Sequence, residues 1–111
     1  MNAVRLSSAA VLLNKVLAED PQNTLARRDL GIIYVETKVL TKARRCFEQV
    51  LAAAPDDYLS HYELGIVEAR LGQPQEALRQ MQVACRLAPG SEQCRVELEK
   101  LQHSTSVVNQ K

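Results

Sequence analysis

The chain has 111 residues, with 14 Lys and Arg against 13 Asp and Glu, so its formal net charge is +1 at pH 7. Hydrophobic residues make up 46% of the chain, which is enough to bury a core and excludes a disordered or collagen-like protein. A near-neutral charge gives no long-range field that would concentrate nucleic acid or an anionic membrane. Only 4 Gly and 4 Pro stand among many Ala, Leu, Glu, Gln and Arg, which predicts an almost entirely helical chain.

The first predicted helix covers residues 4–20 and is amphipathic. Asn14 and Lys15 interrupt its apolar stretch, so it does not read as a signal peptide, and no apolar run in the sequence approaches the roughly 20 residues that span a membrane. We therefore expect a soluble chain without membrane insertion. The residues expected on its buried side are Leu6, Ala9, Ala10, Leu13, Val16 and Leu17.

The next four helices come from a repeat with a period of 34 residues. The letters Leu-Gly-Ile at 30–32 recur at 64–66, and Pro55 recurs as Pro89. The full repeats cover residues 24–57 and 58–91, and each reads as two helices ended by its proline. In the same register, residues 4–20 form the second half of a preceding repeat and residues 92–103 begin another. The sequence thus predicts about six helices.

Glycines and short polar residues mark how these helices pack and where they begin or end. Gly31 and Gly65 occupy the same position in the two repeats, where each costs about 1 kcal/mol compared with Ala in a helix. A neighbouring helix is therefore expected to pack there too closely for a side chain. Gly72 is expected to take a left-handed conformation at the end of a helix, and Asp57 and Ser91 are expected to cap helix starts.

A helical hairpin of 34 residues with these markers resembles the tetratricopeptide repeat family, whose pattern is W-x-x-L-G-x-x-Y, A-x-x-x-F and then P. The first repeat reads R-x-x-L-G-x-x-Y at 27–34, A-x-x-x-F at 43–47 and Pro55, and lacks only the leading Trp. The second reads H-x-x-L-G-x-x-E at 61–68, A-x-x-x-M at 77–81 and Pro89. The resemblance implies an all-α solenoid of helical hairpins over residues 1–103, and it says little about a specific function.

The two ends of the array are predicted to differ. The helix at 92–103 places Cys94, Leu98 and Leu101 on one stripe and polar residues outside it, as expected of a capping helix, and residues 104–111 are expected to form a flexible tail. The first helix carries Val11 and Leu12 where later repeats are mostly polar. We expect an exposed apolar strip there, which indicates either a chain cut from a longer array or a surface for self-association or docking.

No arrangement typical of an enzyme, a metal site or a cofactor site is present in the sequence. Phosphate-binding loops, dinucleotide fingerprints, zinc-protease and serine-hydrolase motifs are all missing. His61 and His103 lie on different helices, and Cys46 has no recognisable catalytic partner. We therefore expect no enzyme activity, no cofactor and no metal.

The three cysteines are widely spaced and lack a C-x-x-C pattern, which favours a reducing compartment such as the cytoplasm. Cys85 is expected to be buried. Because Cys85 and Cys94 flank one turn, the sequence leaves two alternatives for them, a disulfide bond or two free thiols.

Two pairs of basic residues, 27–28 and 44–45, are the residues that could contact nucleic acid. They lie on different predicted helices, and no aromatic residues are interleaved with them to stack bases. We interpret both pairs as solvated helix faces and expect no nucleic-acid partner.

A peptide-binding groove follows from the register of the repeat. In a stack of such hairpins the first helix of each repeat lines a concave surface, and residues 34 positions apart stand side by side. One such row, the acidic row, is Asp29, Glu63 and Glu97, and apolar residues run beside it. The predicted groove residues are Leu25, Arg28, Asp29, Ile32, Glu36, Leu59, Tyr62, Glu63, Ile66, Arg70, Val96, Glu97 and Lys100.

These residues favour a non-enzymatic adaptor that binds a protein or peptide partner, with apolar side chains over the groove and a Lys or Arg facing the acidic row. The alternative for the acids is that they pair with nearby basic residues or face water. The alternative function is a structural assembly module that forms a homo-oligomer or docks through Val11 and Leu12. The resemblance also implies a chaperone-tail carboxylate clamp, which is less favoured because Ile32 and Glu63 stand where that subgroup carries Asn, and only Arg28 matches its basic residues.

Overall fold

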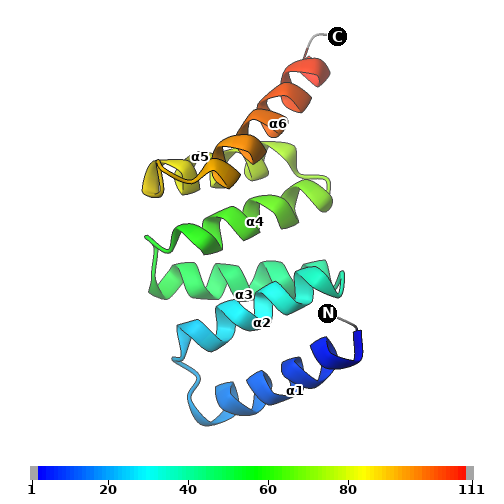
Figure 1. Ribbon diagram of the computed structural model, residues 1–111, viewed down its shortest axis with the longest axis vertical. Helices are drawn as coiled ribbons and strands as arrows, with labels where there is room; N and C mark the ends of the chain where they lie inside the picture. Colours follow the sequence, from blue (N-terminus) through cyan, green and yellow to red (C-terminus); the bar gives the residue numbers. More distant parts are fainter. Residues whose placement is uncertain (1–2, 110–111) are drawn as a thin grey trace. The chain divides into compact units, whose positions relative to one another are not determined.

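The computed structural model describes the backbone of residues 3–109 and the side chains of residues 3–104. This part of the chain forms six α-helices and no strand: α1 (Ala3–Glu19), α2 (Thr24–Glu36), α3 (Leu40–Ala53), α4 (Tyr58–Arg70), α5 (Pro74–Leu87) and α6 (Glu92–Asn109). They belong to two compact units, the first ending at Pro55 and the second beginning at Asp56 (Figure 1). The prediction of an all-α helical repeat fold is confirmed.

In the first unit, α2 and α3 form a hairpin and α1 packs on α2 (Figure 1). The core of this unit lies along the apolar stripe of α3, where Ala43, Phe47 and Val50 recur every three or four residues and are at most 1% exposed. Leu30 of α2 is 4% exposed and Leu6 of α1 is 6% exposed. The hairpin thus holds its own core, to which α1 adds.

Gly31 lies where α2 and α3 come closest. A Cβ atom on Gly31 would stand 2.8 Å from Cζ of Phe47 and 3.1 Å from Cβ of Cys46. Both distances are too short for ordinary contact, so the close approach expected from the sequence is confirmed in this repeat.

In the second unit, α4 and α5 form the equivalent hairpin and α6 packs on α5. Met81 and Ala84 of α5 and Cys94 of α6 form a fully buried cluster. At Gly65 a Cβ atom would stand 3.2 Å from both the Ala77 carbonyl oxygen and Cε of Met81, so this glycine also lies at a close approach. Partly buried side chains that pack against the cluster are Tyr62, Ile66, Cys85, Leu98 and Leu101.

The starts of three helices use equivalent residues in related ways. Asn23 Oδ1 accepts a hydrogen bond from the Ala26 backbone N–H at 3.0 Å, and Ser91 Oγ accepts one from the Cys94 N–H at 3.2 Å. Asp57 precedes α4 as its N-cap, but its carboxylate accepts a hydrogen bond from the Ser60 hydroxyl at 2.7 Å instead. This bond gives a partner to Ser60, which is fully buried.

The turns within the two hairpins have the same backbone form. Gly72 has φ +79°, as the sequence predicts, and Lys38, which is 34 positions earlier, has φ +63°. The Lys38 backbone N–H donates to the Val35 carbonyl, and the Gly72 N–H donates to the Ala69 carbonyl. In each turn the N–H of the following residue also donates to a carbonyl of the preceding helix. The left-handed conformation therefore comes with the hairpin, although only the second repeat has the residue that adopts it without strain.

Three details differ from the sequence-based expectations. α6 continues to Asn109 instead of ending at residue 103, because no Gly or Pro follows Gly90 to stop it. Val16 is 40% exposed, because α1 packs mainly against α2 and one neighbour covers a narrower stripe than expected. Cys85 is only partly buried, at the edge of the cluster around Met81.

Candidate functional site

Two neighbouring hollows in the second unit are lined by residues of the predicted groove. The first, of about 250 Å³, lies between Ile66 and Arg70 of α4 and Glu97 of α6, above Met81. The second, of about 360 Å³, lies between Tyr62 of α4 and α6 residues that include Val96 and Glu97. Because Glu97 lines both, the hollows adjoin at a carboxylate. We call them the groove hollows.

The charges of the acidic row converge on Tyr62 in this unit. Burial raises the pKa of the Tyr62 phenol, and the carboxylates of Glu97 and Glu63 raise it further. Both acids therefore act on one hydroxyl, as neighbours in a row would. Lys100 Nζ lies 3.4 Å from Glu97 Oε1, and since the Lys100 side chain is 68% exposed this ion pair is weak.

The other predicted groove residues take different positions. Leu59, in the second unit, is partly buried. Those of the first unit all belong to α2 and, at spacings of three or four residues, share one face of that helix. On this face Arg28 and Ile32 are partly buried, and the exposed residues are Leu25, Asp29 and Glu36.

His61, Cys85 and Cys94 contact other side chains that hold the helices together. His61 Nδ1 lies 2.8 Å from Gln80 Oε1, which ties α4 to α5. Cys85 and Cys94 are close enough for their thiols to interact, and burial together with the neighbouring thiol raises the pKa of Cys85. All three cysteines are free. Among the side chains described, no group of three or more His, Cys, Asp and Glu could hold a metal ion.

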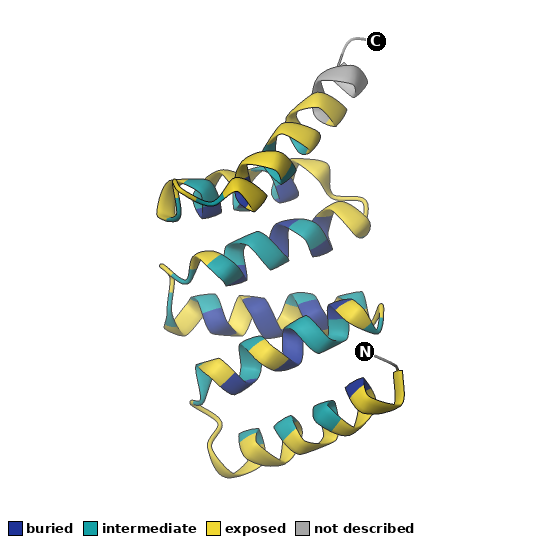
Figure 2. Ribbon diagram, viewed as in Figure 1, coloured by how far each residue is buried: buried dark blue, intermediate teal, exposed yellow. Residues whose placement is uncertain are grey.

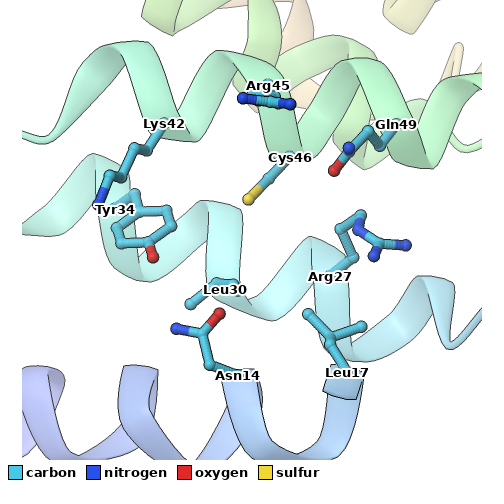
Figure 3. A pocket seen from close by; sticks show the side chains of 9 residues that line it. All are labelled: Asn14, Leu17, Arg27, Leu30, Tyr34, Lys42, Arg45, Cys46 and Gln49. Carbon is cyan, nitrogen blue, oxygen red and sulfur yellow. The ribbon is translucent and has the colours of Figure 1, made fainter. Parts of the chain in front are cut away.

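A cavity of about 280 Å³ in the first unit, lined by α1, α2 and α3, was not predicted from the sequence (Figure 3). It brings together Arg27 and Arg45, which were interpreted as members of separate basic pairs. Part of the signal was present, since Lys42, Arg45 and Gln49 recur at spacings of three and four on α3 and so share a face. The position of this face relative to α1 and α2 is set only by the packing of the three helices.

The outer side of α1 exposes apolar residues, and Figure 2 shows most of this helix exposed. Val11 is 56% exposed and Leu12 is 62% exposed, in agreement with the strip expected from the sequence, and Val4 extends it at 75%. In the part of the chain that the structure describes, no helix is both long and apolar enough to cross a bilayer.

Curated relatives match only part of the chain. It is 35% identical over 66 residues to the mouse (Mus musculus) protein O-mannosyl-transferase TMTC3, a match that covers 60% of this chain and 7% of the mouse protein. The human (Homo sapiens) protein of the same name is 35% identical over 57 residues, covering 51% of this chain and 6% of the human protein. The matched region is thus a small part of much longer proteins.

Solved structures share the fold over most of the chain. MamA from Desulfovibrio magneticus RS-1 aligns with a TM-score of 0.87 at 25% identity, over 92% of this chain and 58% of MamA. The first tetratricopeptide domain of Spaghetti (RPAP3), bound to the HSP90 peptide SRMEEVD, gives 0.89 at 18% identity, over 92% and 81%. The Sgt2 domain from Aspergillus fumigatus gives 0.89 at 16%, over 96% and 72%.

Family profiles agree with the repeat seen in the sequence and the hairpins seen in the structure. Two profiles described as tetratricopeptide repeat match residues 4–64 and 40–92. The first covers more than half of the chain, and the two together include both full repeats. The chain belongs to the tetratricopeptide repeat family.

Proposed function

We propose that this chain is a non-enzymatic adaptor that binds a polypeptide segment of another protein along the first helices of its repeats. The observation that carries the proposal is the pair of groove hollows in the second unit, which adjoin at Glu97 and are bordered by Tyr62, Ile66 and Val96. Hollows of this kind, lined by both apolar and polar side chains and acidic where they meet, suit a segment that carries both apolar and basic side chains.

The chemistry of the hollows defines the partner more closely. Apolar side chains of the segment would occupy the hollows and supply most of the affinity, because burying apolar surface is the main favourable term in such contacts. A Lys or Arg would face Glu97 and Glu63 and fix the register of the segment.

The structural neighbours support a polypeptide ligand as a class. The two RPAP3 domains were solved with HSP90 and HSP70 peptides, and their resemblance to this chain, at 18% and 21% identity, is one of fold. Ile32 and Glu63 replace the Asn residues of the chaperone-tail clamp, which makes an acidic chaperone tail the less favoured ligand here. Because the match to the mouse relative covers 7% of that protein, we propose no transferase activity for this chain.

The proposal is tested by quantitative affinity capture from a cell lysate with mass spectrometry. The groove variant combines Val96→Asp with Glu97→Lys, since Val96 is 39% exposed and a change there spares the core. Ile66→Asp is unsuitable because Ile66 packs against the buried cluster around Met81. The control is Glu99→Lys, which reverses an exposed charge on the same helix outside the groove hollows.

We expect a protein that wild type and Glu99→Lys retain and the groove variant loses, while the circular dichroism of all three chains stays the same. Equal capture by all three chains would show that these hollows are not the binding surface. Loss in both variants would show a dependence on net charge alone.

A second candidate function, assembly through α1, is favoured by the exposure of Val11 and Leu12 at 56% and 62%. If α1 mediates self-association, light scattering will show a mass that rises with concentration in wild type and stays monomeric in Val11→Glu with Leu12→Glu. Leu87→Glu is the control, because Leu87 is 41% exposed on α5 of the other unit. A wild-type chain that remains monomeric at every concentration would exclude this candidate.

A further inference from the structure

The cavity in the first unit is positively charged. Of the nine side chains that line it, three are basic and none is acidic: Asn14, Leu17, Arg27, Leu30, Tyr34, Lys42, Arg45, Cys46 and Gln49. On α2 the lining residues Arg27, Leu30 and Tyr34 lie on the side of the helix opposite to the predicted groove residues, by the spacing of an α-helix. We call it the cationic cavity.

Contacts within the unit position two of the basic side chains. Arg27 Nη1 donates a hydrogen bond to the Pro21 carbonyl oxygen at 2.7 Å, which fixes its guanidinium at one end of the cavity. Lys42 Nζ lies 5.8 Å from the centroid of the Tyr34 ring at the other end (Figure 3). Within the part of the chain whose side chains are described, Arg27, Lys42 and Arg45 form no ion pair with an acidic residue.

The positive charges act on the space that they surround. Cys46 directs its sulfur into the cavity (Figure 3) and is 7% exposed. Burial raises the pKa of the Cys46 thiol, whereas the guanidinium groups of Arg27 and Arg45 both lower it. Both arginines therefore favour negative charge at this position, which is partly removed from water and so weakly screened.

The size and the polar groups of the cavity indicate what kind of anion fits. At about 280 Å³ it lies just below the roughly 300–1,000 Å³ typical of small-molecule sites, and it has room for one acidic side chain. Asn14 Nδ2 donates to the Ala10 carbonyl at 3.0 Å, which directs the Asn14 amide oxygen toward the cavity. That oxygen can accept a hydrogen bond from a peptide N–H of the segment that carries the acidic side chain.

We propose that the cationic cavity binds a Glu or Asp side chain of a partner polypeptide, with Arg27, Lys42 and Arg45 around the carboxylate and Asn14 accepting from the backbone of the same segment. The proposal is independent of the groove hollows, because it involves other residues and the opposite charge preference. An acidic segment would be repelled by Glu63 and Glu97 and attracted here. The chain would then present two surfaces that select different partners.

The probe is a fluorescein-labelled decapeptide of Glu, with the corresponding Gln peptide as its uncharged counterpart, in a fluorescence anisotropy titration at low salt. The cavity variant combines Lys42→Gln with Arg45→Gln, and both residues are exposed enough to be replaced without disturbing the core. The matched control combines Lys15→Gln with Arg44→Gln, which removes the same charge from α1 and α3 outside the cavity.

We expect the cavity variant to bind the Glu peptide about tenfold more weakly than wild type, and the control variant to bind it within about twofold of wild type. The side-chain amide NMR signals of Asn14 and Gln49 should shift on addition of the Glu peptide and stay in place with the Gln peptide. Equal weakening of both variants, or unchanged Asn14 and Gln49 signals, would overturn the proposal. So would inorganic phosphate that displaces the peptide at comparable concentration, because the ligand would then be any small anion.

Discussion

The two repeats solve the same packing problem with different side chains. Gly31 faces Phe47, a fully buried aromatic ring, whereas the equivalent Gly65 faces the Ala77 carbonyl oxygen and the flexible end of the buried Met81 side chain. With Phe47 Cζ at 2.8 Å, the rigid ring leaves no room for a methyl group on Gly31. A methyl group on Gly65 would stand 3.2 Å from Met81 Cε, which can turn away, and 3.2 Å from the Ala77 carbonyl oxygen, a contact that is tight but longer than those at Gly31. Packing therefore excludes a side chain more strictly at Gly31 in the first repeat than at Gly65 in the second.

The largest difference between the repeats should appear on replacing these glycines by alanine. Gly31→Ala is expected to lower the free energy of unfolding by about 2 kcal/mol, because overpacking against Phe47 outweighs the gain in helix propensity. Gly65→Ala is expected to change it by less than about 1 kcal/mol. Urea denaturation followed by circular dichroism measures both.

The role of the Phe47 ring is isolated by placing Gly31→Ala in a Phe47→Met background. This gives the first repeat the side-chain pair of the second, and the cost of Gly31→Ala should fall by about 1 kcal/mol or more. An unchanged cost would mean that another contact, such as Cys46 Cβ at 3.1 Å, determines the effect.

A smaller effect is expected at the left-handed turn residues, where the second repeat has the better residue. Gly72→Lys should destabilise the chain by about 1 kcal/mol, because a side chain disfavours positive φ. Lys38→Gly should stabilise it by a similar amount, since Lys38 has φ +63°. Thermal or urea unfolding of the two single variants tests the pair, and two changes of the same sign would show that the turns are not equivalent.

The smallest effect concerns pH. The folded-state pKa of Tyr62 is raised above the ordinary value of about 10, so the folded chain keeps this proton longer than the unfolded chain does. The resulting stability is fully present below the ordinary pKa and is lost as the pH rises through the folded value. Glu97→Gln should lower the Tyr62 pKa toward ordinary, as followed by the Tyr62 ring signals in an NMR titration. The same titration of Glu99→Gln is the control and should match wild type.

Features that repeat in the sequence could be predicted, and features that depend on several helices could not. The 34-residue period predicts the hairpins, together with the prolines that end them, Pro55 and Pro89. The close approaches within the hairpins are predicted by Gly31 and Gly65. Lys38 carries no sign of its left-handed conformation, because the turn imposes it. The extension of α6 beyond residue 103 was not predicted, because its only sign in the sequence is the lack of a Gly or Pro after Gly90.

The binding surfaces show the same division. The register of the repeat places Tyr62, Glu63 and Glu97 near one another, and the structure has the two carboxylates acting on the Tyr62 hydroxyl. The cationic cavity needs residues from α1, α2 and α3 that no periodicity relates, such as Asn14 and Arg45. The positive charge of this cavity becomes evident only when the packing of α1, α2 and α3 is known.

Whether α4 and α6 hold a partner polypeptide is decided by NMR of the isotopically labelled chain with the binding segment of the captured protein. We predict shifts of the Ile66 methyl and Tyr62 ring signals as the segment is added, with the signals of Val11 and Leu12 unchanged. The shifts should disappear in the Val96→Asp, Glu97→Lys chain and persist in Glu99→Lys. Shifts confined to Val11 and Leu12, with Ile66 and Tyr62 unmoved, would contradict the proposed function and assign binding to α1.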